Sequence, residues 1–325
     1  MRSIILVVSI LVFWSCQKED GINRQLVNQP NSEYVVGKNY FTLDSNGDTR
    51  EYYVHVPATY NESTPIPVVF MLHGSSGNGE KFYNISVWKE LGETENILTV
   101  FPSSWEYCKN DPNGSGATRI TTKWNILADD ASYCPGQNPR DDIQFLKDII
   151  EELNEKFNID INRKYLVGFS NGGAMALRCA VEMSDVFAAI VESAGSTSIE
   201  ATYIPKRDIP VTYQIGNANK SDRRPLPMQS LDSLLHTPPF KNTIATHINS
   251  FNLEATYTIS GDPNEAITAA YKGVSDPTLE LNITLIKDLE HGYPNGTNHP
   301  MKGAEVNWEW FKQFSLPDIS RKIKK

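Results

Sequence analysis

The sequence is poor in cysteine, has no excess of positive charge and contains no apolar run long enough to form a transmembrane helix. Its formal net charge is −9 at pH 7. Because proteins that bind nucleic acid present a basic face to the phosphates, this charge argues against nucleic acid as a partner. The 20 glycines and 19 prolines among 325 residues are ordinary amounts, which excludes collagen-like and low-complexity chains. A chain of this length can bury roughly three quarters of its unfolded surface, so it needs neither a metal nor a disulfide to hold a core.

The N-terminus has the layout of an exported protein. Arg2 precedes an apolar run, Ile4–Trp14, that is shorter than the ~20 residues needed to span a bilayer and is typical of a cleaved signal peptide over residues 1–15. Cys16 directly after this run resembles the acylated cysteine of a bacterial lipoprotein, and the acidic segment that follows resembles a surface-export tag. We therefore expect a lipid anchor on Cys16, a tether over residues 16–32, and a location at the outer membrane or cell surface. The alternative is a secreted or periplasmic protein with a free Cys16.

The remaining cysteines fit an oxidising compartment. Cys108 and Cys134 lie in a stretch rich in Gly, Asn and Asp and are candidates for a disulfide. Cys179 lies in a helical apolar pattern and is expected to be a buried thiol. One thiol stays unpaired whichever pair forms, and there is no Cys-x-x-Cys motif, so we expect no metal site.

Short, unbroken apolar runs alternate with amphipathic helical patterns along most of the chain. The expected strands are 34–42, 50–56, 68–72, 97–101, 164–167, 187–191, 211–215 and 281–286, and the expected helices are 141–157, 171–183 and 304–314. This order predicts an α/β fold with a mostly parallel central sheet covered by helices on both faces. We expect one catalytic domain over 33–318, with an N-terminal antiparallel hairpin, two long insertions at about 103–140 and 217–252, and a basic tail at 319–325.

The motif Gly168-Phe-Ser170-Asn-Gly172 lies between an expected strand and an expected helix. In this position, Gly-x-Ser-x-Gly is typical of a nucleophile elbow, where a strained turn exposes a serine at the carboxyl edge of a sheet. Ser170 is therefore the candidate nucleophile. The alternative interpretation is a glycine-rich helix start with a capping serine.

A nucleophilic serine needs N–H donors for the oxyanion and a general base. We expect the donors to be the N–H groups of Asn171 and of Ser75, in the loop after strand 68–72. His73 in that loop is expected to be structural. The base must follow the last strand, which indicates His291, with His299 as its competitor.

Together these motifs resemble those of the polyhydroxybutyrate depolymerase/feruloyl esterase family, which is similar to carbohydrate esterase family 1. The resemblance covers most of 34–315 and rests on Leu72-His73-Gly74, Asp141-Asp142, residues 159–163, the elbow at 168–175, His291-Gly-Tyr-Pro and the terminal 308–314. It implies an α/β-hydrolase fold and a secreted serine esterase. It also implies that Trp124, followed by Asn125, lines the site.

One position departs from the family pattern. The third member of the triad orients the imidazole and stabilises its charged form, and in the family it is the Asp of a Gly-x-x-Asp segment. Here the segment begins at Gly216 and the matching position is Asn219. Three readings stay open. Asp222 supplies the carboxylate, unless it forms a surface cluster with the adjacent arginines; Asp288 or Glu290 supplies it; or the enzyme is weakened or inactive.

We expect a serine esterase that uses no cofactor and acts on feruloyl or acetyl esters of polysaccharides, or on hydroxyalkanoate oligoesters. Trp105, Trp124 and Tyr293 are candidate aromatic walls, although packing is an equal alternative for Trp105. The expected partners are the ester substrate and, through the lipid anchor alone, a membrane. Two alternatives remain: a serine peptidase of the same fold, and a non-catalytic glycan-binding protein, which Asn219 motivates.

Overall fold

The computed structural model describes residues 34–110, 116–127, 133–195, 204–218, 230–238 and 240–317. All of them belong to the unit Tyr34–Lys325, which is separate from Met1–Glu33. The expected signal peptide, the tether with Cys16 and the basic tail lie outside the described residues and stay predictions. Within the described residues, no helix is long and apolar enough to cross a membrane.

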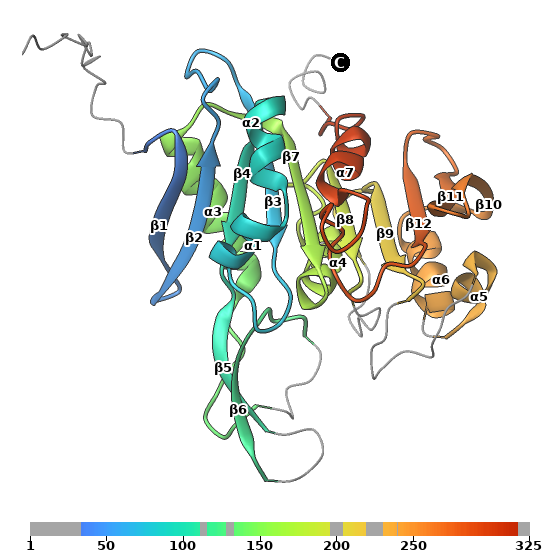
Figure 1. The fold of residues 1–325 in the computed structure, drawn as a ribbon, viewed down its shortest axis with the longest axis horizontal. Helices are drawn as coiled ribbons and strands as arrows, with labels where there is room; N and C mark the ends of the chain where they lie inside the picture. Colours follow the sequence, from blue (N-terminus) through green and yellow to red (C-terminus); the bar gives the residue numbers. More distant parts are fainter. Residues whose placement is uncertain are drawn as a thin grey trace, which may run out of the picture. The chain divides into compact units, whose positions relative to one another are not determined.

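A ten-stranded sheet runs through the described chain (Figure 1). In spatial order its strands are β1 (Gly37–Ser45), β2 (Asp48–Val56), β4 (Leu98–Pro102), β3 (Ile66–Leu72), β7 (Ile159–Phe169), β8 (Ala189–Ser193), β9 (Val211–Gly216), β12 (Glu280–Ile286), β11 (Ala266–Gly273) and β10 (Leu253–Asp262). Neighbours from β4 to β12 are parallel, and β1–β2 and β10–β11 add antiparallel edges. The predicted mostly parallel sheet with an N-terminal hairpin is confirmed.

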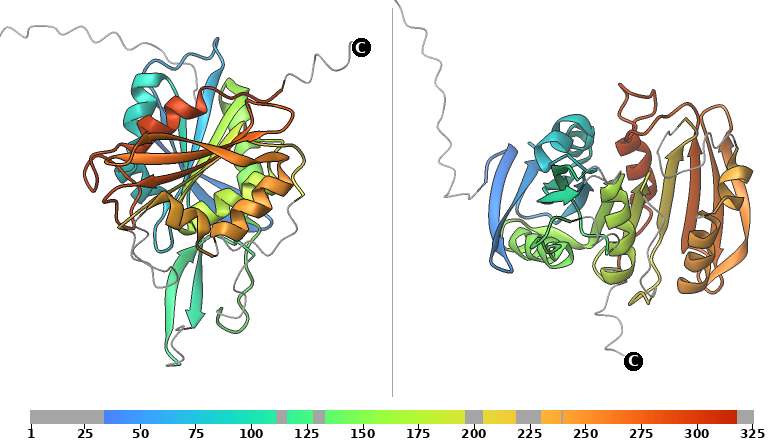
Figure 2. Two further views of the ribbon diagram at one scale, coloured as in Figure 1. Left: turned by 90° about the vertical axis from the view of Figure 1, so that its right-hand side faces the viewer. Right: turned by 90° about the horizontal axis from the view of Figure 1, so that it is seen from below.

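Helices cover both faces of this sheet (Figure 2). One face carries α3 (Asp142–Lys156), α4 (Asn171–Glu182), α5 (Leu231–His236) and α6 (Phe240–Ser250), and the other carries α1 (Gly79–Ile85), α2 (Trp88–Glu95) and α7 (Gly303–Phe311). Every residue of β3, β4, β8 and β9 is buried. Their unbroken apolar runs thus reflect burial on two faces.

The structure also contains elements that the apolar pattern does not reveal. β7 begins at Ile159, five residues before the expected start, and the early part was missed because the four residues after Ile159 are half-buried or exposed and form no apolar run. β10 was not predicted, since nearly all of its side chains are exposed at the edge of the sheet. The second insertion contains α5 and α6 rather than irregular chain alone.

The first insertion forms a separate hairpin, β5 (Trp105–Asn110) and β6 (Thr118–Lys123), which projects from the main sheet (Figures 1 and 2). A disulfide joins Cys108 of β5 to Cys134, which lies beyond β6. Cys179 is a buried free thiol. The disulfide therefore ties the return segment of the insertion to its first strand.

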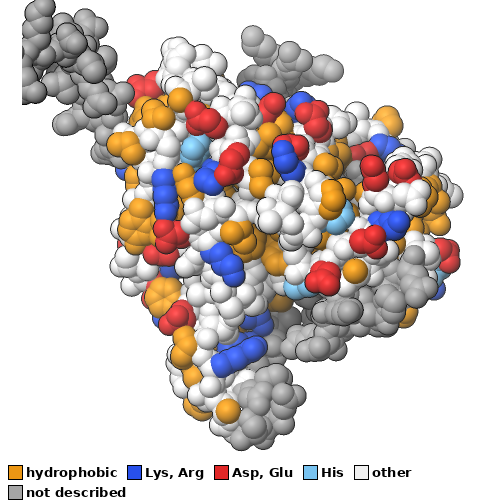
Figure 3. Space-filling view, viewed as in Figure 1, with side chains coloured by type: hydrophobic (Ala, Val, Ile, Leu, Met, Phe, Trp, Pro, Cys, Tyr) orange, Lys and Arg blue, Asp and Glu red, His pale blue; other side chains and the backbone are white. Residues whose placement is uncertain are grey.

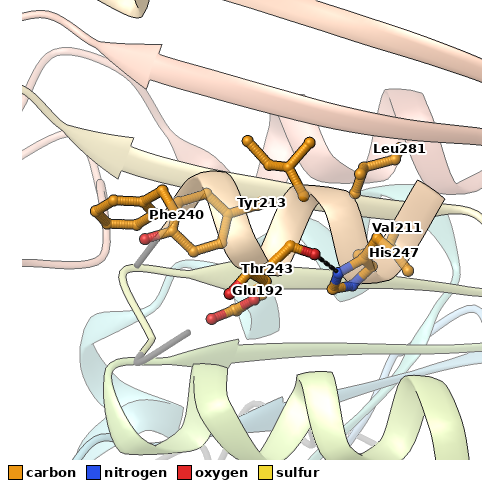
Figure 4. Close-up of a pocket in the computed structure, with 8 residues that line it drawn as sticks. Glu192, Val211, Tyr213, Phe240, Thr243, His247 and Leu281 are labelled. Atoms are coloured by element: carbon orange, nitrogen blue, oxygen red, sulfur yellow. Dashed lines mark hydrogen bonds between the residues drawn. The ribbon is translucent and has the colours of Figure 1, made fainter. Parts of the chain in front are cut away.

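Two histidines, His73 and His247, are buried, and burial disfavours the charged form of an imidazole. His73 directly follows β3. Its Nδ1 donates to the carbonyl of the next residue, Gly74, at 2.7 Å, and its Nε2 accepts from the Ser104 N–H at 2.9 Å. His247 in α6 donates from Nδ1 to the Thr243 carbonyl at 2.9 Å, beside a cavity of about 10 Å³ (Figure 4). That volume suits about one water molecule rather than a substrate. Burial lowers the pKa of each histidine from 6.5 to about 4.

These pKa values predict that stability falls on acidification. Between pH 6.5 and pH 4 the unfolded chain binds protons at His73 and His247 that the folded chain does not bind, so the free energy of unfolding rises with pH across this window. Each histidine contributes about 3 kcal/mol over the window, at 1.36 kcal/mol per pKa unit. Urea unfolding at a series of pH values measures this slope. His247→Gln should reduce this slope by about half. An unchanged slope would contradict the conclusion that the lowered pKa of His247 contributes to the pH dependence of stability.

Candidate active site

Ser170 occupies a strained bend between β7 and α4. Its φ of 56° and ψ of −117° lie in a region that non-glycine residues rarely adopt. The Ser170 N–H donates to the Ser193 carbonyl of β8 at 2.8 Å, and the Ser170 carbonyl accepts the Ala174 N–H at 3.0 Å, the first bond of α4. These bonds fix the backbone on both sides of the strain. Such strain is typical of functional residues and is the geometry expected of a nucleophile elbow.

Two glycines of the motif are required by close backbone approach. A Cβ on Gly168 would lie 1.9 Å from the Gly172 carbonyl oxygen. A Cβ on Gly172 would lie 2.5 Å from the carbonyl oxygens of both Leu72 and His73. No side chain fits at either position without moving backbone, so the first turn of α4 sits directly against β3 and β7.

The Ser170 hydroxyl faces His291, which lies 121 residues further along the chain, in the loop between β12 and α7. The distance from Ser170 Oγ to His291 Nε2 is 3.0 Å. The Phe169 ring packs 5.0 Å from the imidazole. An imidazole at hydrogen-bond distance can take the proton of a serine hydroxyl as that hydroxyl attacks a carbonyl.

The competing histidine has a different role. His299 donates from Nε2 to the Lys287 carbonyl at 2.8 Å, and its Nδ1 accepts the Met301 N–H at 3.1 Å. Both ring nitrogens are thus used to hold the loop that carries His291. The structure brings together Ser170 and His291, not Ser170 and His299.

The two N–H groups predicted as oxyanion donors have no hydrogen-bond acceptor within the described residues. Asn171 is the first residue of α4, where an N–H cannot form an intrahelical bond. Within the described residues, the Ser75 N–H donates to no protein acceptor. The loop that carries Ser75 is fixed by hairpin β5–β6, because the Ser76 N–H donates to the Thr122 carbonyl at 3.0 Å and Thr122 Oγ1 donates to the Gly77 carbonyl at 2.5 Å.

Of the four residues considered as the third member of the triad, two lie in the described part of the chain and two lie outside it. Asp222 and Asn219 lie outside the described residues, which break off after Ala218 and resume at Ser230. Asp288 and Glu290 are exposed, and within the described contacts neither carboxylate forms an ion pair or hydrogen bond with His291. The reading in which Asp288 or Glu290 orients His291 is therefore not supported.

Trp124 is not an aromatic wall, which corrects the role implied by the family resemblance. Its side chain is 0% exposed. Its Nε1 donates to the His73 carbonyl at 2.8 Å, and its backbone N–H donates to Asn171 Oδ1 at 2.6 Å. Trp124 therefore connects the loop after β3 with the start of α4, behind the surface that a substrate can reach.

Of the other two aromatic candidates, Tyr293 lines the cavity next to His291 and Trp105 does not. Trp105 lies beside the Arg140 guanidinium, 4.7 Å from its ring centre, and does not line the cavity next to His291, so the packing alternative describes it. Tyr293 does line that cavity, but it is 5% exposed and its hydroxyl accepts from Trp88 Nε1 at 3.0 Å and Asn307 Nδ2 at 3.1 Å. Burial raises the pKa of Tyr293. Its hydroxyl is thus structural.

A buried polar network supports Trp124 and was not predicted. Asp142 accepts from Arg50 at 2.7 Å and from the Asn125 N–H at 2.7 Å, and Arg178 donates to the Asn125 carbonyl at 2.7 Å. Burial raises the pKa of Asp142, and the charge of Arg50 opposes this effect. The sequence signal was Asp142 itself, a second aspartate at a helix start, which was used as part of the family motif Asp141-Asp142. Removing one partner of such a buried pair typically costs about 3–5 kcal/mol.

No group of three or more His, Cys, Asp or Glu side chains that could hold a metal ion occurs among the described residues.

Residues 44–247 match the family model described as "Putative esterase". The bifunctional acetylxylan esterase/xylanase XynS20E of Neocallimastix patriciarum is 24% identical over 81% of this chain and 33% of that protein. Feruloyl esterase B of Piromyces equi is 23% identical over 82% of this chain and 46% of that protein. The chain spans about half, or less, of the length of the curated relatives it matches.

A solved structure, the poly(3-hydroxybutyrate) depolymerase LpqC of Bordetella parapertussis, superposes with a TM-score of 0.51 at 15% identity and covers 88% of this chain and 93% of that one. At this identity the likeness concerns the fold. Together with the family model, these matches confirm the predicted α/β-hydrolase fold and the resemblance deduced from the motifs.

Replacing Trp124 tests its positioning role. Trp124→Phe removes the hydrogen bond to the His73 carbonyl, and we expect kcat to fall by roughly 10- to 100-fold because small displacements of reacting groups are costly. KM should change little, and the loss should be equal for p-nitrophenyl acetate and methyl ferulate. Trp105→Phe is the control and should retain activity. A rise in KM for methyl ferulate alone, with kcat unchanged, would contradict this role and would indicate that Trp124 contacts the aromatic part of the substrate.

Proposed function

Because this chain belongs to the "Putative esterase" family, we propose that it hydrolyses carboxylic esters through a serine-bound acyl intermediate. The observation that carries this proposal is the 3.0 Å contact between Ser170 Oγ and His291 Nε2 at a strained strand–helix bend. Ser170 and His291 lie far apart in sequence, so only the folded chain brings their side chains into contact.

The reaction follows from the placement of these groups. Ser170 Oγ attacks the ester carbonyl carbon while His291 takes its proton, and the N–H groups of Asn171 and Ser75 stabilise the oxyanion. His291 then gives the proton to the departing alcohol, which leaves an acyl group on Ser170. A water molecule, deprotonated by His291, then attacks the acyl carbon; the bond from this carbon to Ser170 Oγ breaks, His291 returns the proton to Ser170 Oγ, and the carboxylic acid is released. Each step uses groups of this chain and water.

The proposed substrates are feruloyl or acetyl esters of polysaccharides, or hydroxyalkanoate oligoesters. The names of the relatives, an acetylxylan esterase/xylanase and a feruloyl esterase, support the first class. We further propose that Cys16 carries a lipid that anchors the enzyme at the cell surface. An anchored esterase would release its products close to the cell.

We propose Asp222 as the acid that orients His291. It follows β9, the strand after which this fold places the triad acid, by a few residues. Asn219, at the position that matches the family pattern, can accept a hydrogen bond but supplies no charge. This asparagine motivates the rival function, a glycan-binding protein on a hydrolase scaffold, in which Ser170 would be unreactive.

Labelling with a fluorophosphonate probe tests the nucleophile. The probe should label the wild-type protein, and Ser170→Ala should abolish both labelling and ester hydrolysis, with a fall in kcat of about 10⁵-fold or more. Ser75→Ala is the matched control: it keeps the backbone N–H of Ser75 and should be labelled like the wild type. An unreactive wild-type protein with affinity for glycans would favour the binding function instead.

Exchanging the acid tests the triad. Asp222→Asn should lower kcat about 10⁴-fold, the effect of the same exchange in the serine protease template. Asp232→Asn, on the exposed surface of α5, is the control and should leave kcat unchanged. Full activity of the Asp222 variant, together with a loss in Asn219→Ala, would assign the orienting role to Asn219.

A further inference from the structure

A cavity of about 220 Å³ opens beside the Ser170–His291 pair. It is bounded by groups of the proposed reaction, His291 and Ser75, and by the apolar side chains of Phe82, Ile85 and Phe169. The rings of Phe82 and Phe169 stack at 6.0 Å. The cavity therefore offers an apolar floor next to the position of the reacting ester.

The amide side chains on its rim are used within the protein. Asn295 Nδ2 donates to the Ile85 carbonyl at 2.9 Å, and Asn295 Oδ1 accepts the N–H groups of Thr297 and Asn298. Asn298 Nδ2 donates to the Tyr293 carbonyl at 2.9 Å, and its Oδ1 accepts the Asn295 N–H at 3.0 Å. These amides shape the loop after His291 and are poorly placed to select a polar substrate group.

Lys81 of α1 is the remaining polar side chain at the cavity that could select a substrate group. Among the described residues that line the cavity, it is the sole Lys, Arg, Asp or Glu. Its ammonium group forms no ion pair within the described part of the chain, whereas Lys38 pairs with Glu80 and Lys302 with Glu305. Figure 3 shows acidic and basic side chains interspersed over the surface, as expected when most charges have neighbours of opposite sign.

The position of Lys81 gives its charge access to the reaction site. The Lys81 side chain is exposed, and its charge acts on the buried imidazole of His73, directly before the oxyanion loop. In a protein of net charge −9, a cation without a carboxylate partner is thus located at the mouth of the proposed catalytic cavity.

From this geometry, and resting on the proposed esterase function, we propose that Lys81 is a specificity-determining residue for esters that carry a carboxylate a few carbons from the scissile bond. The apolar floor accommodates the intervening carbons, and the ammonium group binds the carboxylate. Such a carboxylate comes either with the acyl group, as in a dicarboxylic monoester, or with the alcohol, as in a hydroxyalkanoate oligomer.

The experiment compares anionic and neutral esters of matched size. On the acyl side, mono-p-nitrophenyl glutarate is compared with p-nitrophenyl valerate. On the alcohol side, 3-acetoxybutyrate is compared with its methyl ester. We expect Lys81→Gln to lower kcat/KM for the anionic member of one pair about tenfold and to leave the neutral esters unchanged, since a partly solvated charge pair is worth about one factor of ten. Lys81→Glu should lower it further, and added salt should weaken the wild-type preference.

Lys241→Gln, an exposed lysine of α6 on the opposite face of the sheet, is the matched control and should behave as the wild type. The pair that responds identifies whether the carboxylate belongs to the acyl group or to the alcohol. If neutral esters are hydrolysed and the anionic-to-neutral ratio is the same in wild type, Lys81→Gln and Lys241→Gln, the inference about Lys81 is wrong and the esterase proposal stands. If no ester is hydrolysed and the fluorophosphonate probe does not react, both are wrong.

Discussion

The strained backbone at Ser170 is the constraint on which the candidate site depends. A left-handed φ at a non-glycine residue costs of order 1–3 kcal/mol and persists only where its surroundings hold it. Here the Ser170 N–H is bound to β8, and Gly168 and Gly172 let α4 approach β7 and β3 without side chains between them. The sheet thus forces the hydroxyl outward, and the same approach leaves the N–H groups at the start of α4 unpaired for an oxyanion.

A second layer of contacts links this bend to the body of the protein. Trp124 binds the loop after β3 and the side chain of Asn171, and the buried pair of Asp142 and Arg50 holds the segment that carries Trp124. None of these side chains faces the cavity beside His291. Their contribution is to fix the backbone segments that carry the proposed oxyanion donors and the proposed nucleophile.

The sequence predicted what depends on local pattern. The elbow was recognisable because Gly168, Ser170 and Gly172 lie within one short segment of the chain. His291 was recognisable because the fold places the base after the last parallel strand. The predicted role of Trp124 as a wall of the site was wrong, because its partners come from two other segments and no local pattern reports them. The pair of Arg50 and Asp142 was missed for the same reason. β10 escaped prediction because an exposed edge strand has no apolar run to reveal it.

The hairpin β5–β6 shares hydrogen bonds with the loop of Ser75 at its base, through Thr121 and Thr122, while its far end projects from the sheet. A change confined to the distal part of the hairpin would leave these basal hydrogen bonds intact, whereas a displacement of its base would move the loop that carries Ser75.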